Sequence, residues 1–412
     1  MAQSSDLTIV RDLAERYAEQ AARPIQNARR NLWRDHNSRV RTRPLIYMRA
    51  FAWRELPDSQ CVCEDPFLRS LEMPLRQKLF WTELEDDSVF EPWFVVSAAK
   101  KLPPGGVWGV PIRWIGRGNG CAGICESPLK EPEDLAKMVV PEHCIDEAAT
   151  AARVARVQEV FGDRLPVSVD RAPAWVSWNA DISTCLAQLR GLEQIMWDMM
   201  DRPEWLHELL SFMRDGILKA HREAEAAGDW HLNHHQNQAV PYARELADPA
   251  AGGDAVSRRD LWWFCAAQES AVIGPEQFDE FLVQYQLPIM REFGLVAYGC
   301  CEDLTQKIDV LRQIPNLRRI AVSPMADVAS CAEQIGDEYV FSYRPSPSDM
   351  VGYSWDEARV RRILRHDLGV CKANGCHVDI TLKDVETVQG ERQRLFDWMR
   401  VAREVIAEVY GG

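Results

Sequence analysis

The sequence predicts an α/β protein of the (β/α)8 barrel class, also called the TIM barrel. Eight short apolar runs lie along the chain, and helical sequence follows each of them. Alternating strands and helices are typical of a parallel sheet that closes into a barrel, whose catalytic groups sit at the carboxyl ends of the strands. The eight runs lie within residues 43–53, 89–97, 165–172, 261–270, 294–303, 319–323, 339–344 and 377–384.

The chain before the first run is predicted to form a helical arm. Residues 6–38 mix apolar and charged residues in a helical pattern, and Pro24 opens a new turn. We expect the arm to cover residues 1–42 and a single barrel domain to cover residues 43–412. The segment 103–141 is expected to form a long loop or a small hairpin, because it is rich in Gly and Pro. Loops of this length in compact domains are usually functional.

Polar side chains stand at the ends of most predicted strands. The segment 294–303, GLVAYGCCED, is the strongest candidate site, because a buried run stops abruptly at two cysteines and two acids. Among the charged residues Arg49, Asp170, Arg171, Glu269, Asp327, Arg344, Lys383 and Asp384, we expect about half to face a substrate and some to form structural ion pairs. In chain order, the polar strand-end residues are Arg49, Asp170, Arg171, Gln268, Glu269, Tyr298, Cys300, Cys301, Asp327, Arg344, Lys383, Asp384 and Glu386.

Other Cys and His residues raise the question of metal binding. Cys121 and Cys125 lack the second pair of ligands that a structural zinc site needs. His231, His234 and His235 are close in sequence, but no predicted strand end supports them, so hydrogen-bonded or solvated histidines are expected. The cysteine pair itself has a competing interpretation, in which both residues are small packing groups at the barrel rim.

Composition limits the class of partner. The formal net charge of −14 argues against nucleic acid and anionic membranes, which attract clustered Lys and Arg. The N-terminus lacks the apolar segment of a signal peptide, and no apolar stretch is long enough to span a membrane. Twelve irregularly placed cysteines suit a reducing compartment, so we expect a cytoplasmic protein.

Two stretches carry a resemblance to a known family. RPLIYMRAF, residues 43–51, resembles the first strand of the uroporphyrinogen decarboxylase superfamily, with Arg49 at the place of its first arginine. The Gln, Gly and second Arg of that motif are absent here, which argues against a porphyrin substrate. LVAYGCCED, residues 295–303, resembles the fifth-strand region of the corrinoid-dependent methyltransferases in the same superfamily. The resemblance covers most of residues 43–405 and implies a (β/α)8 barrel.

The resemblance also implies a metal site. Cys300 falls at the position of a Cys ligand of those methyltransferases, while Tyr298 replaces their His. Their third ligand follows the last strand, where this chain has Asp384 and Glu386, so the expected zinc ligands are Cys300, Cys301 and Glu386. A second pattern, Asp303, Cys331 and Cys371, resembles that of ether-cleaving methyltransferases, although the two cysteines fall in predicted helices toward the opposite barrel face.

These features predict a methyltransferase that moves a methyl group from a small methylated substrate, such as a methoxylated aromatic, to cobalamin. The chain has no Asp-x-His-x-x-Gly motif, so a partner protein is expected to carry the corrinoid. Tyr298, Lys383 and Asp384 are the expected catalytic groups. The expected substrate-binding residues are Arg49, Asp170, Gln268, Glu269 and Arg344. A cofactor-free decarboxylase or lyase, and a non-catalytic binding subunit, remain open alternatives, as does a homodimer.

Overall fold

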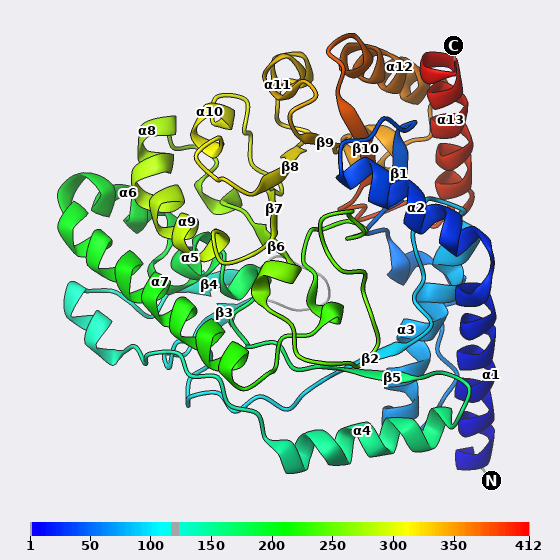
Figure 1. Cartoon of the computed structure of the whole chain (residues 1–412), viewed down its shortest axis with the longest axis horizontal. Coiled ribbons are helices and arrows are strands. Elements are labelled where there is room, and N and C mark those ends of the chain that lie inside the picture. The colour runs from blue at the N-terminus through cyan, green and yellow to red at the C-terminus, as the bar shows by residue number, and fades with distance from the viewer. Residues whose placement is uncertain (1, 117–122, 412) are drawn as a thin grey trace.

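The computed structural model describes residues 2–116 and 123–411. It is a mixed α/β structure with eight parallel strands, each of which overlaps one apolar run expected from the sequence, although β8 begins two residues before its run (Figure 1). Six of them form one sheet in the order β1-β10-β9-β8-β7-β6, and β2 pairs only with β5. The strands are β1 Leu45–Met48, β2 Phe94–Ser97, β5 Val167–Asp170, β6 Trp262–Cys265, β7 Leu295–Tyr298, β8 Leu317–Val322, β9 Val340–Tyr343 and β10 His377–Leu382.

Helices surround the strands (Figure 1). The segment 103–141 contains an antiparallel hairpin, formed by β3 Arg113–Ile115 and β4 Ile124–Glu126. The α-helices are α1 Ala2–Ala22, α2 Ile25–Asn37, α3 Pro66–Glu83, α4 Glu147–Phe161, α5 Ser183–Arg190, α6 Leu192–Asp201, α7 Pro203–Ala226, α8 Pro275–Phe278, α9 Gln284–Met290, α10 Ile308–Leu311, α11 Val328–Ile335, α12 Glu357–Ala373 and α13 Gln393–Tyr410. Within the described ranges, no helix is both long and apolar enough to cross a membrane.

The expected closed ring of strands is not complete. Among the described strands no hydrogen-bonded pairing joins β1 to β2. Two acids satisfy the edge of β1 instead: the Ile46 amide donates to Asp87 Oδ2 and the Met48 amide to Asp86 Oδ2, both at 2.8 Å. Because side chains replace a neighbouring strand, the wall has a seam here between β1 and β2.

A second seam lies between β5 and β6, which also do not pair in the described part of the chain. Residues 233–236 fill it. Asn233 Nδ2 donates to the Val169 carbonyl of β5 at 3.2 Å, and the Gln236 amide donates to the Trp262 carbonyl of β6 at 3.1 Å. His235 Nδ1 accepts a hydrogen bond from the Trp262 amide at 3.3 Å. The histidine-rich segment therefore bridges two strands, which agrees with the expectation of hydrogen-bonded histidines.

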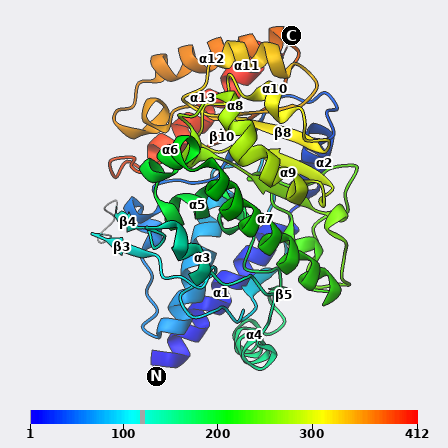
Figure 2. The same cartoon turned by 90° about the vertical axis from the view of Figure 1, so that its left-hand side faces the viewer.

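The two N-terminal helices pack tightly on the rest of the chain. Helix α1 lies along α3 and contacts α4 (Figure 1). Helix α2 covers the amino-terminal end of the strands, where His36 Nε2 lies 3.0 Å from Asp379 Oδ2 in β10. In Figure 2, α2 lies on the right and the β3–β4 hairpin, which follows β2, lies on the left. The carboxyl ends of the strands are therefore on the side of the hairpin.

Candidate functional site

The cysteine pair lies in a tight turn after β7. Gly299 begins the turn with a φ of +99°, and a Cβ atom there would approach Leu304 Cδ1 to 2.7 Å, so glycine is required. Cys300 is buried and Cys301 is exposed, and their sulfur atoms lie 3.6 Å apart. The turn thus presents one covered and one accessible sulfur at the strand end.

Lys383 joins the pair from the end of β10. Its buried Nζ donates to Cys301 Sγ at 3.1 Å and to Cys300 Sγ at 3.5 Å. It also forms an ion pair with Asp384, whose positive φ of 56° places an exposed carboxylate beside the ammonium group. One lysine therefore links both sulfurs to a solvent-exposed acid.

Cys300 is the ionised member of the pair. The hydrogen bond from Cys301 lowers the pKa of Cys300 to about 5, and this outweighs the opposing effect of burial. The positive charges of Arg344, Lys383 and Arg49 contribute to this same lowering of the Cys300 pKa to about 5. The pKa of Cys301 is raised in turn, first by its hydrogen bond to Cys300 and then by burial. At neutral pH the site therefore holds a Cys300 thiolate and a Cys301 thiol.

The cations around Cys300 come from three neighbouring strands. Arg344, buried at the end of β9, donates to the Cys300 carbonyl at 2.7 Å, and its Nε has no partner among the described residues. Arg49 follows β1 and donates to Gln238 Oε1 at 2.6 Å. Burial tends to lower the pKa of Lys383. The negative charge of Cys300 is the main effect that opposes burial, and the net result is a raised pKa. Three positive charges thus surround one thiolate.

Glu302 holds the turn in place and did not appear among the predicted site residues. Its carboxylate accepts hydrogen bonds from the Cys300 amide at 2.7 Å and from the Ala267 amide at 2.8 Å. Burial raises the pKa of Glu302 despite these backbone donors. The sequence shows an acid directly after Cys301, but its role as a link to the β6 turn depends on the tertiary fold.

Tyr298 does not reach the cysteine pair. Its side chain is buried among the helices outside the sheet, and its hydroxyl donates to Gln286 Oε1 of α9 at 2.7 Å. Burial raises the pKa of Tyr298 well above its ordinary value. The predicted role as a proton donor in the site has no geometric support.

The substrate-binding candidates near β5 and β6 are engaged elsewhere. His234 Nε2 lies 2.9 Å from Asp170 Oδ1, and its hydrogen bond helps to lower the pKa of Asp170 against the effect of burial. Glu269 accepts hydrogen bonds from Ser183 Oγ and Thr184 Oγ1, both at 2.9 Å. Gln268 Nε2 donates to Glu269 Oε1 at 3.2 Å. None of these three predicted side chains bonds to the cysteine pair.

The predicted zinc ligands do not form a complete set. Two thiolates on one tetrahedral zinc lie about 3.8 Å apart, close to the 3.6 Å found here. Lys383 already places a positive charge against both sulfurs, however, and exposed Glu386 makes no hydrogen bond or ion pair with them in the described chain. Across residues 2–116 and 123–411, no group of three His, Cys, Asp or Glu side chains could hold a metal. The residues present therefore fit an ammonium-paired thiolate better than zinc.

The two cysteines of the alternative metal pattern lie in helices outside the turn that holds the pair. Cys331 lies in α11, where its sulfur contacts Thr305 Oγ1 at 3.8 Å, and Cys371 lies in α12. Both are buried. Cys121 falls outside the described residues, while Cys125 Sγ contacts the Gln188 carbonyl at 3.6 Å. These contacts are typical of packed thiols.

Comparison with known proteins identifies the fold. No protein-family model matches the chain, and no curated protein matches it either. Among solved structures, the chain is similar to a methyltransferase from Methanosarcina mazei, with a TM-score of 0.51. The match covers 93% of this chain and 99% of that chain at 10% sequence identity. At so low an identity, the likeness shows a shared methyltransferase-like fold and nothing finer.

Proposed function

We propose that this protein is a methyltransferase that moves a methyl group from a small methylated compound, such as a methoxylated aromatic, to a corrinoid carried by a partner protein. The eight strands then act as an open (β/α)8 barrel with its site at the strand ends. The observation that carries the proposal is the contact of the Lys383 ammonium with Cys300 and Cys301 at the end of β7. The methyltransferase-like fold supports it.

Lys383 would act as the acid in this reaction. A methyl ether reacts slowly because its oxygen leaves as a poor anion, so protonation of that oxygen lowers the barrier. The raised pKa of Lys383 keeps its ammonium group charged at neutral pH. Asp384 pairs with the ammonium and is exposed, so it would exchange the proton with solvent.

The remaining charged groups would position the substrate and stabilise the departing oxygen. Arg344 and Arg49 place positive charge near Cys300. These charges would stabilise the negative charge that develops on the leaving oxygen of a substrate bound beside the pair. The Cys300 thiolate orients Lys383 and keeps it protonated. The corrinoid, as second substrate, would supply the nucleophile that accepts the methyl group.

The test is methyl transfer to free, chemically reduced cobalamin from methoxylated aromatics, methylamines and methyl sulfides. The absorbance change of cobalamin on methylation reports the reaction. Lys383→Met should reduce the rate at least about 100-fold, the usual contribution of a general acid. Lys101→Met, at an exposed lysine after β2, is the matched control and should leave the rate unchanged. No transfer from any donor class would refute the proposal.

A cofactor-free decarboxylase or lyase is the second candidate. The convergence of Arg49, Arg344 and Lys383 favours it, because three cations suit a carboxylated substrate. In this alternative, Lys383 would protonate the carbanion equivalent and Asp384 would return a proton from solvent to Lys383, whereas Asp170 is engaged by His234. Release of carbon dioxide from small carboxylic acids, without any cobalamin, would support this candidate over methyl transfer.

A further inference from the structure

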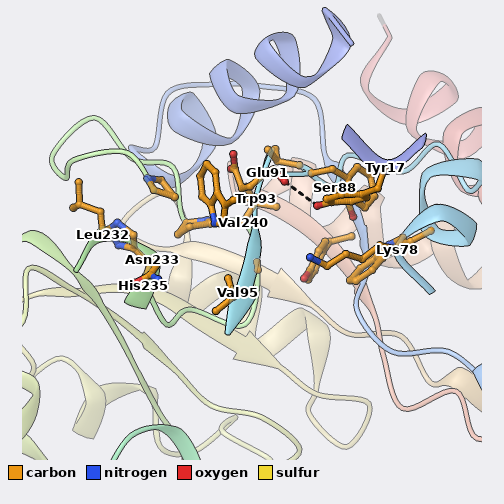
Figure 3. Close-up of a pocket in the computed structure, with 17 residues that line it drawn as sticks. Tyr17, Lys78, Ser88, Glu91, Trp93, Val95, Leu232, Asn233, His235 and Val240 are labelled. Atoms are coloured by element: carbon orange, nitrogen blue, oxygen red, sulfur yellow. Dashed lines mark hydrogen bonds between the residues drawn. The ribbon is translucent and has the colours of Figure 1, made fainter. Parts of the chain in front are cut away.

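A cavity of about 300 Å3 opens at the seam between β1 and β2, away from the cysteine pair. It lies beside the amino-terminal end of β2, whereas the cysteines follow the carboxyl end of β7. Figure 3 shows Lys78 and Tyr17 on one side of β2 and Asn233 and His235 on the other. Its volume is at the lower end of the range of small-molecule pockets, roughly 300–1,000 Å3.

Aromatic rings form much of the cavity wall. The rings come from α1, β1, α3 and the segment before β2, and they are Tyr17, Tyr47, Trp81, Phe90 and Trp93. Aliphatic side chains, among them Val95 and Val240, complete the lining. Such a surface gains free energy by covering a flat, apolar ring.

Lys78 places a positive charge at this wall without an acid to pair with. Its Nζ lies 4.8 Å from the centre of the Tyr17 ring, and it makes no hydrogen bond or ion pair in the described chain. The nearby acid, Glu91, is already engaged, since its carboxylate accepts from Arg30 at 2.9 Å and from the Tyr242 hydroxyl at 2.5 Å. Burial lowers the pKa of Lys78 to about 8 despite Glu91. An unpaired, partly desolvated ammonium group favours an anion.

A second polar atom of the lining is also unsatisfied. Asn233 Nδ2 donates to Ser168 Oγ at 2.9 Å, but its buried Oδ1 has no donor in the described residues. The cavity therefore combines an apolar body with a few polar groups that have no internal partner. This combination is typical of a binding site rather than of a packing defect.

We propose that this cavity binds a small aromatic carboxylate, with Lys78 as its counter-ion and the five aromatic rings as its walls. A single ring matches the volume, and one ammonium group matches one carboxylate. Phosphate-bearing ligands fit less well, because they are usually held by Arg or by several backbone amides. The site is independent of the chemistry at the cysteine pair.

The probe is benzoate, and binding to the full-length protein is measured by titration calorimetry. Benzoate should bind the native protein, while benzyl alcohol, which has the ring without the charge, and acetate, which has the charge without the ring, should bind at least about tenfold more weakly. Affinity for benzoate should fall as the pH rises through about 8, because Lys78 then loses its charge. Equal binding of benzyl alcohol, or no binding of benzoate, would overturn the proposal.

Variants assign the binding to the cavity. Lys78→Met keeps the length of the side chain and should weaken benzoate binding at least about tenfold, or about 1.4 kcal/mol. Lys78→Arg should retain binding, and Lys101→Met should not change it. If Lys78→Met fails to fold, Lys78→Arg and the pH dependence of the native protein still decide the question. Unchanged affinity in a folded Lys78→Met protein would refute the site.

Discussion

The negative charge of Cys300 is stabilised by side chains that follow four different strands. A thiol in ordinary surroundings has a pKa of about 8.5, whereas the hydrogen bond from Cys301 and the nearby cations lower the pKa of Cys300 to about 5. Since the folded pKa is the lower one, the thiolate stabilises the fold fully above about pH 8.5. This stabilisation is lost as the pH falls through about 5. The site should therefore be charged throughout the neutral range and fail in acid.

Removing Lys383 should make this thiolate harder to form. In Lys383→Met, the midpoint of Cys300 ionisation should rise by about one pH unit or more, because a nearby cation is lost. Ultraviolet absorbance of the thiolate follows the titration of the coupled pair, and subtraction of the titration of the Cys300→Ser/Cys301→Ser double variant removes the signal of the other cysteines. Lys101→Met serves as the control. An unchanged midpoint in Lys383→Met would show that the lysine does not act on Cys300.

The variant Glu386→Gln tests whether Glu386 is a zinc ligand, as the sequence predicts. Glu386 is exposed and makes no hydrogen bond or ion pair with either cysteine in the described structure, so Glu386→Gln should leave both metal content and activity unchanged. Metal is measured on protein purified without chelators, beside Cys301→Ser. A loss of zinc in Glu386→Gln would restore the ligand set expected from the sequence and contradict the ammonium-paired site.

At the scale of elements, side chains close the edge of the main sheet. Strand β1 lacks a partner on the side of β2, and Asp86 and Asp87 accept its backbone amides instead. Asp87 also pairs with Arg43 at 2.6 Å. The opening that remains beside this edge is the cavity that Lys78 lines.

Asp87→Ala should therefore destabilise the fold by about 1–3 kcal/mol, the usual effect of leaving a buried amide unsatisfied. Urea unfolding measures the change. Asp163→Ala, at a fully exposed acid after α4, should have almost no effect. Equal stability of the two variants would mean that water or a rearranged β2 satisfies the edge of β1.

Sequence patterns predicted the strands well and the direction of their side chains poorly. Each of the eight apolar runs overlaps a strand, because continuous apolar stretches bounded by polar residues are a strong signal. The sequence places Tyr298 among the expected site residues, yet in the structure its hydroxyl faces α9. Strands buried on both faces lack the alternation that reveals which side faces inward. The roles of Asp86 and Glu302 depend on contacts between distant elements, which no local pattern encodes.

On the scale of the whole molecule, the two ends of the strands differ in chemistry. The carboxyl ends gather a thiolate, cations and an exposed acid, while the amino-terminal end is closed by a buried network. There, Asp379 Oδ1 accepts from Arg319 at 2.5 Å, and His36 of α2 lies against the other carboxylate oxygen. Arg319, Asp379 and His36 are almost fully buried. A buried charge network of this kind requires every member, because removing one leaves another without a partner.

This closure bears on the predicted division into an arm and a barrel domain. A fragment of residues 43–412 would lose His36 and the cover of α1 over α3, and would expose the apolar face that buried Trp33 now occupies. We therefore expect the fragment to aggregate or to unfold at a much lower temperature than the full chain. Thermal unfolding and size-exclusion chromatography measure this.

The variant His36→Gln in the full chain tests the buried network of His36, Asp379 and Arg319 without removing the other contacts of α1 and α2. Glutamine can still donate to Asp379, so this variant should lose much less stability than the fragment. Asp379→Asn removes the charge that pairs with Arg319 and should cost about 3–5 kcal/mol, as expected for a broken buried ion pair. A soluble 43–412 fragment with the stability of the full chain would show instead that the first 42 residues are a separable arm, because the strands would then need no cover from α1 or α2.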